Sequence, residues 1–104
     1  MLVTTNRYKP DQIISLKLVN GDEVVAKLVE ETATDYIVSK PTTVMPSQQG
    51  IGLMQSLFTS DLNTNITISK SHVMMNSPTI SEMENHYIHT TTGIEPVTAG
   101  SIIQ

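Results

Sequence analysis

The sequence predicts a small, mainly β domain in which about five short antiparallel strands form a strongly bent or closed sheet before one C-terminal helix. Three observations predict this class. Apolar and polar residues alternate over several short segments, which is the period of half-buried strands. Turn residues separate these segments. Apolar residues at helical spacing occur near the C-terminus, without the strand–helix rhythm of a parallel sheet. The 104 residues fit a single domain.

The first two strands flank the dipeptide Asn20-Gly21. Residues 13–19 alternate, so that Ile14, Leu16 and Leu18 share one face, and residues 23–31 return antiparallel. Asn-Gly is typical of a two-residue hairpin turn, because both of its central residues need a positive φ. We therefore expect such a turn at this position.

The middle of the chain predicts a third strand and a fourth. Residues 36–40 form the third after a polar turn at 32–35. Pro41 and Pro46 suit an edge or a bend and do not suit a central strand. The fourth segment, "IGLMQSLF" at 51–58, carries apolar residues on both faces. It is predicted to be a core strand buried on both sides, or alternatively a contact between subunits.

The last strand region follows a loop at residues 60–65. Residues 65–69 alternate, and 73–75 extend the strand beyond Lys70-Ser71-His72. The helix is predicted at about 79–92, where Thr79 and Glu82 fit a capping box. Its apolar stripe consists of Ile80, Met83, Tyr87 and Ile88, Gly93 provides a stop, and the tail 94–104 is expected to be loose.

Composition excludes several classes of function. The chain has no cysteine, which excludes disulfides and thiolate metal sites. It shows neither a secretion signal nor a membrane-spanning run, so a soluble intracellular protein is the default expectation. The net charge of −4 argues against a general nucleic-acid binder. A protein that reads a few bases in a confined site stays compatible with that charge.

The sequence predicts no enzyme, cofactor or metal site. Glu82, His86 and His89 have the spacing of helix-borne metal ligands, but a single helix supplies them and a solvated face is the expected role. No activated nucleophile, glycine-rich phosphate loop or zinc signature appears. The small core, with three Tyr and one Phe, favours self-association.

Two segments resemble the motifs of the Sm family. Residues 16–31 resemble the first motif, whose apolar–small–x–Leu core matches positions 25–28. Residues 66–78 resemble the second motif, which places a short basic turn between the two final strands. In the bacterial Sm-like protein Hfq that turn is Lys-His; here Lys70 and Ser71 fall on those positions, with His72 one step later.

The span 13–94 is similar to the Sm-like proteins of marine T4-type (cyano)phages, through runs such as "GIGLM", "SHV" and "TTGI". The resemblance implies an SH3-type, five-stranded Sm-like barrel with its core at 13–78. It also implies a homo-oligomeric ring of about five to seven copies, in the cytoplasm of the infected host cell if the protein is phage-encoded. Three positions depart from the Sm family: Ala26 replaces the motif glycine, Thr32 and Asp35-Tyr36 replace the Asp-x-x-Met-Asn turn that holds a base, and Lys70-Ser71 replaces the Arg-Gly pair. Uridine selectivity therefore does not carry over.

The resemblance also gives candidate nucleic-acid-binding residues. It places Lys70, Ser71 and His72 on the inner rim of the ring, where Lys would contact a phosphate and His a base; the alternative is an exposed turn without a ligand. Tyr36 would stack on a base or belong to the core. Asp35 and Thr32 would bond a base or cap their turn.

Two functions follow as expectations. The first is a phage-encoded ring that binds single-stranded RNA, with DNA as the alternative strand, in RNA processing or regulation. The second is an oligomeric scaffold for protein assembly that binds no nucleic acid. The acidic net charge favours the scaffold, and the Lys-Ser-His turn favours the RNA-binding ring.

Overall fold

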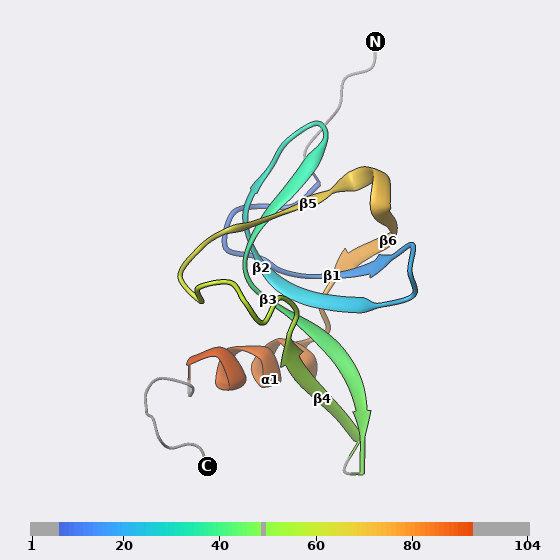
Figure 1. The fold of residues 1–104 in the computed structure, drawn as a ribbon, viewed down its shortest axis with the longest axis vertical. Coiled ribbons are helices and arrows are strands. Elements are labelled where there is room, and N and C mark those ends of the chain that lie inside the picture. Colours follow the sequence, from blue (N-terminus) through green and yellow to red (C-terminus); the bar gives the residue numbers. More distant parts are fainter. Residues whose placement is uncertain (1–6, 49, 93–104) are drawn as a thin grey trace.

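The computed structural model describes residues 7–48 and 50–92, which form six strands and one α-helix (Figure 1). Gly93 and the tail 94–104 lie outside the described residues. The predicted class, mainly β with a C-terminal helix, is confirmed. The elements are β1 (Ile13–Leu18), β2 (Glu23–Glu31), β3 (Asp35–Ser47), β4 (Gly50–Gln55), β5 (Ile66–Ser69), the 3₁₀ turn η1 (Lys70–His72), β6 (Val73–Pro78) and α1 (Ser81–Thr92).

The strands form one antiparallel sheet that does not close into a barrel within the described chain. The sheet order is β4-β3-β2-β1-β6, and β5 pairs with the beginning of β3. The strand count is therefore six rather than about five. The sequence predicts a strongly bent or closed sheet, and the closed form, a barrel, is not observed. Bulges bend the sheet where the β2–β3 register shifts, between Val25 and Lys27 and again between Leu28 and Glu30.

The first hairpin has a three-residue loop, so the predicted two-residue turn is wrong. The Gly21 N–H donates to the Leu18 carbonyl (2.9 Å), and the Leu18 N–H donates to the Asp22 carbonyl (2.8 Å). Gly21 alone in the loop has a positive φ, of 97°. The Asn20 side chain accepts a hydrogen bond from the Asp22 N–H (3.0 Å) and so caps the turn. The φ of Asn20 itself is not positive.

Strand β3 continues through both prolines and is longer than predicted. Pro41 follows Lys40, whose φ is 49°, at the bulge where β3 passes Ala26. Pro46 lies in the outer part of β3, which pairs with β4 alone. The prolines thus occupy a bend and an edge as predicted, but they do not end the strand. The outer half of β3 and β4 form an arm that extends beyond the rest of the sheet (Figure 1).

Strand β4 is not the doubly buried core strand that the sequence predicts. Leu53 is half-buried and packs against a small cluster with Val25 and Tyr87, while Ile51 and Met54 are exposed. Phe58, beyond the end of the strand, is 69% exposed. The predicted strand therefore ends too late, and much of its apolar surface faces solvent.

The core lies on both faces of the sheet because β2 alternates. Val24, Ala26 and Leu28 point into the larger cluster, and Val25 points to the side that α1 covers. The larger cluster also holds Tyr8, Ile14, Leu16, Tyr36 and Val38. On the helix side the cluster is small, with Ile13, Val25 and Tyr87 as its buried members.

Tyr87 is the main anchor of α1. It is 2% exposed, its hydroxyl donates to the Ser39 carbonyl (2.8 Å), and it accepts from the Lys27 N–H (3.2 Å). The rest of the predicted stripe is buried in part, because Met83 is half-buried while Ile80 and Ile88 are exposed.

The predicted capping box is wrong. The Thr79 hydroxyl shares a hydrogen bond with the Ser15 hydroxyl (2.8 Å) instead of reaching into the helix. The Thr79 N–H also donates to the Ile13 carbonyl (3.2 Å). Thr79 therefore prolongs the pairing of β6 with β1, and the helix begins later, at Ser81.

Candidate nucleic-acid interface

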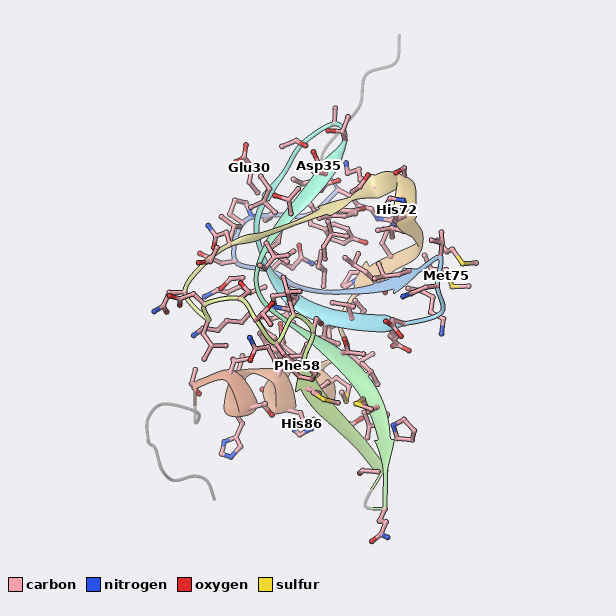
Figure 2. The ribbon with its side chains drawn as sticks, viewed as in Figure 1. Glu30, Asp35, Phe58, His72, Met75 and His86 are labelled. Carbon is pink, nitrogen blue, oxygen red and sulfur yellow. The ribbon has the colours of Figure 1, made fainter. Side chains whose placement is uncertain are left out.

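Two turns that are far apart in the sequence lie side by side at one end of the sheet. Asp35, the first residue of β3, pairs with Ser69, the last residue of β5. The Lys70 N–H donates to the Thr34 carbonyl (2.8 Å), which joins η1 to the turn at residues 32–35. Figure 2 shows Asp35 and His72 at this end, well away from His86 on the helix. The structure therefore brings the six predicted site residues into one region.

The turn at 32–35 holds itself together with its own side chains. The Thr32 hydroxyl accepts from the Asp35 N–H (2.9 Å) and the Thr34 N–H (3.3 Å). One Asp35 carboxylate oxygen accepts from the Thr34 hydroxyl (2.8 Å). Thr32 thus has the capping role that was its alternative interpretation. The second Asp35 oxygen keeps its acceptor capacity for a ligand.

The turn η1 exposes two of its three side chains. The Ser69 hydroxyl accepts from the Ser71 N–H (3.3 Å) and lies 2.8 Å from the Ser71 hydroxyl. The His72 carbonyl accepts from the Val19 N–H (2.9 Å), so the first hairpin supports η1 from the other side. Because the backbone is fixed in this way while Ser71 and His72 are exposed, their side chains are available to hydrogen-bond or stack against a ligand.

Lys70 is not a free cation. Its Nζ lies 2.9 Å from Oε2 of Glu31, and the two side chains are 23% and 3% exposed. The ammonium also lies 5.1 Å from the centroid of the Tyr36 ring, within the range of a cation–π interaction. The sequence predicts Lys70 as a phosphate contact, and the structure gives this residue an anionic partner within its own subunit.

Glu31 is the residue of this region that sequence reasoning missed. Its Oε1 accepts from the backbone N–H groups of Arg7 (2.9 Å) and Tyr8 (3.0 Å), and its Oε2 holds Lys70. Burial alone raises the pKa of Glu31, but the hydrogen bonds from Lys70 and from the two backbone groups outweigh it, and the net pKa is lowered. The carboxylate is therefore ionised at neutral pH.

Strict alternation along β2 would turn Glu30 inward and Glu31 outward, as a continuation of Val24, Ala26 and Leu28. The bulge between Leu28 and Glu30 reverses this order, so that Glu31 is buried and Glu30 is exposed. No local residue pattern marks this bulge. The sequence therefore held no signal that could have placed Glu31 beside Lys70.

Tyr36 belongs to the main core cluster. It is 4% exposed, and its ring packs against Tyr8 with 6.3 Å between the centroids. Burial raises the pKa of the Tyr36 hydroxyl, so the ring stays neutral. Within one subunit its ring is not open to a base, and the surface available to a ligand consists of Ser71, His72, Asp35 and the accessible part of Lys70.

The described part of the chain contains no group of three or more His, Asp or Glu side chains placed to hold a metal ion. It also contains no helix that is long and apolar enough to cross a membrane. The side chains at the two turns carry hydroxyl, imidazole, carboxylate and ammonium groups, which act through hydrogen bonds and charge. These are the means by which a protein contacts phosphates and base edges.

No protein-family model matches the chain, and no curated protein is similar to it at a significant level. The likeness to the Sm motifs therefore depends on the residues quoted above.

Proposed function

We propose that the chain is an Sm-like subunit of a homo-oligomeric ring that binds single-stranded RNA. One observation carries the proposal: η1 joins two strands that each have an open edge. Among the described residues β5 pairs with β3 alone and β6 pairs with β1 alone. The unpaired N–H and C=O groups of such edges favour pairing with another chain.

In the proposed ring, β5 of one subunit pairs with β6 of the next. Different surfaces of each copy make this head-to-tail contact, so it repeats until the rotation closes, here at about five to seven copies. Met74 and Met75 on β6 support the contact, because both side chains are exposed in the single chain. Pairing would remove their apolar surface from water. It would also set the η1 turns of successive subunits near one another.

The RNA-binding step rests on Ser71 and His72, which are exposed on a hydrogen-bonded turn, and on the partly accessible Lys70 of the same turn. A single copy of this surface is weak because Lys70 is paired. Several copies around one opening raise the affinity for a strand that contacts them together. DNA offers the same phosphates and bases and is the alternative strand.

A second candidate function is a scaffold that assembles proteins and binds no nucleic acid. The Glu31–Lys70 pair favours it, since this pair cancels the charge that would attract a phosphate. The exposed apolar side chains of the β4 arm and the following loop, among them Ile51 and Phe58, also favour it.

Two measurements test the proposal. Sedimentation equilibrium and native mass measurement should give a closed oligomer, and a folded monomer at micromolar concentration would refute the ring. Fluorescence anisotropy with short U-rich and A-rich RNA at low salt should show binding. Lys70→Gln should weaken binding by about tenfold, whereas Lys27→Gln, which removes an exposed charge from β2, should change it by less than about twofold. Equal effects of the two variants would exclude Lys70 as a specific contact, and failure of the wild type to bind RNA would favour the scaffold.

A further inference from the structure

The Glu31–Lys70 pair has an effect on ligand binding that follows from its geometry. The Lys70 side chain is partly accessible while that of Glu31 is buried, so a ligand can reach the cation from solvent but cannot displace the anion directly. Glu31 is held by the backbone N–H groups of Arg7 and Tyr8. It therefore stays in place when Lys70 contacts a ligand.

A phosphate that contacts Lys70 must also lie close to the Glu31 carboxylate. An N–H···O bond from an ammonium to a phosphate oxygen is about 2.8 Å long, and Nζ of Lys70 lies 2.9 Å from Glu31. The two anions are then at most about 6 Å apart, which is less than the screening length of about 8 Å at physiological salt. Repulsion between them cancels much of the attraction to Lys70.

We propose that Glu31 sets the affinity of this interface: it is a built-in counter-ion that competes with the phosphates of a bound single strand for Lys70. This inference rests on the proposed RNA-binding function and adds a residue that acts on the strand through Lys70. An ammonium has three N–H donors, so Lys70 can keep the bond to Glu31 and still contact a phosphate weakly. Binding then becomes strong where several subunits contact one strand.

The test compares Glu31→Gln with Glu30→Gln. Both variants remove one negative charge from neighbouring positions of β2, but Glu30 is exposed and extends away from His72 (Figure 2). In Glu31→Gln the amide oxygen of the new side chain can still accept from the Arg7 and Tyr8 N–H groups, so the variant keeps two of the three bonds of Glu31. Far-UV circular dichroism and the oligomer mass verify that each variant folds and assembles.

Anisotropy with labelled single-stranded RNA at low salt is expected to show about tenfold tighter binding by Glu31→Gln than by the wild type. Glu30→Gln is expected to stay within about twofold. The plot of log affinity against log salt should become steeper for Glu31→Gln, by about 0.7 for each newly neutralised phosphate. In a Lys70→Gln background the gain should disappear, because Glu31 acts through Lys70.

The outcomes separate this inference from the proposed function. If the wild type binds RNA and Glu31→Gln binds no more tightly than Glu30→Gln, the counter-ion role is overturned and the RNA-binding ring stands. Weaker binding by Glu31→Gln also overturns it, since Glu31 would then position Lys70 productively. If the wild type and Glu31→Gln both fail to bind, the inference and the proposed function fail together.

A measurement on the wild type covers the case in which Glu31→Gln does not fold. With ¹³C-labelled glutamate, addition of RNA should shift the carboxyl resonance of Glu31 as Lys70 is drawn toward the strand. The Glu30 resonance, on the exposed face, should move less. An unchanged Glu31 resonance at saturating RNA would overturn the inference.

Discussion

Tyr87→Phe is the perturbation whose cost can be worked out most directly, because the change removes a single oxygen atom. The hydroxyl lies at the bulge between β2 and β3, where it donates to the Ser39 carbonyl and accepts from the Lys27 N–H. Its proton is shared with the Lys40 carbonyl (3.1 Å), so the hydroxyl links three backbone groups where the strand register shifts. The ring itself is retained in phenylalanine, so the helix-side cluster keeps its apolar contacts.

The donated and the accepted hydrogen bond each contribute about 1 kcal/mol net, and a buried backbone group left without a partner costs more. The expected loss in the free energy of unfolding is therefore about 2 kcal/mol. For a domain of this size that loss lowers Tm by about 10 °C. The variants should be compared at equal protein concentration, because association also shifts Tm.

The matched control is Tyr36→Phe. Tyr36 is as buried as Tyr87, but its hydroxyl has no hydrogen-bond partner among the described residues. Thermal and urea unfolding, followed by far-UV circular dichroism, should show a change of less than about 0.5 kcal/mol for this control. If the two variants lose equal stability, the hydroxyl of Tyr87 does not hold the bulge, and the account of how α1 is anchored is wrong.

Two further predictions concern the same helix and the β6 edge. Burial raises the pKa of Tyr87 to about 12 from its ordinary value of 10.0. The folded state therefore stays protonated at pH values where the unfolded state ionises. The stability that Tyr87 contributes is complete below pH 10 and is lost as the pH rises toward 12. Ultraviolet titration of tyrosine ionisation should show one group fewer titrating late in Tyr87→Phe, and an unchanged curve would contradict the shift. Met74→Glu puts a charge on an exposed side chain of the β6 edge and should dissociate the proposed oligomer. Ile88→Glu, on the exposed face of α1, should leave that oligomer intact. Sedimentation velocity checks both variants, and a Met74→Glu oligomer of wild-type mass would exclude β6 from the interface.

The parts of the fold that sequence reasoning predicts well are those that depend on period alone. Alternation at residues 13–19 and 23–31 gives β1 and β2 nearly to the residue. The same reasoning fails where a distant partner decides. Thr79 is in a capping position by sequence, but Ser15 on β1 takes its hydroxyl. Pro41 suggests a strand end, yet a bulge opposite β2 lets the strand continue.

In the candidate site, too, the positions of the residues were predicted and their contacts were not. The turn at 32–35 and the turn η1 meet because β5 pairs with the start of β3, and the Sm-like resemblance named residues in both turns. The residue pattern did not predict that Lys70 would be paired and did not decide whether Tyr36 would be buried. Lys70 is paired because a bulge turns Glu31 inward, and Tyr36 is covered because it packs in the core cluster against Tyr8. A shift of one residue in register exchanges the faces of a strand, and nothing in the order of the amino acids marks that shift.

The difference between the predicted barrel and the observed open sheet bears on the proposed assembly. A closed barrel leaves no strand edge for a neighbour. Here β5 ends at η1 and β6 begins there, and each of these two strands has an open edge among the described residues. The surface that a ligand would contact therefore lies at the junction that assembly would use. If β5 and β6 pair between subunits, Ser71 and His72 of adjacent copies lie close to one another only in the oligomer. RNA affinity should then fall together with assembly in Met74→Glu, although this substitution lies outside the two turns that form the interface.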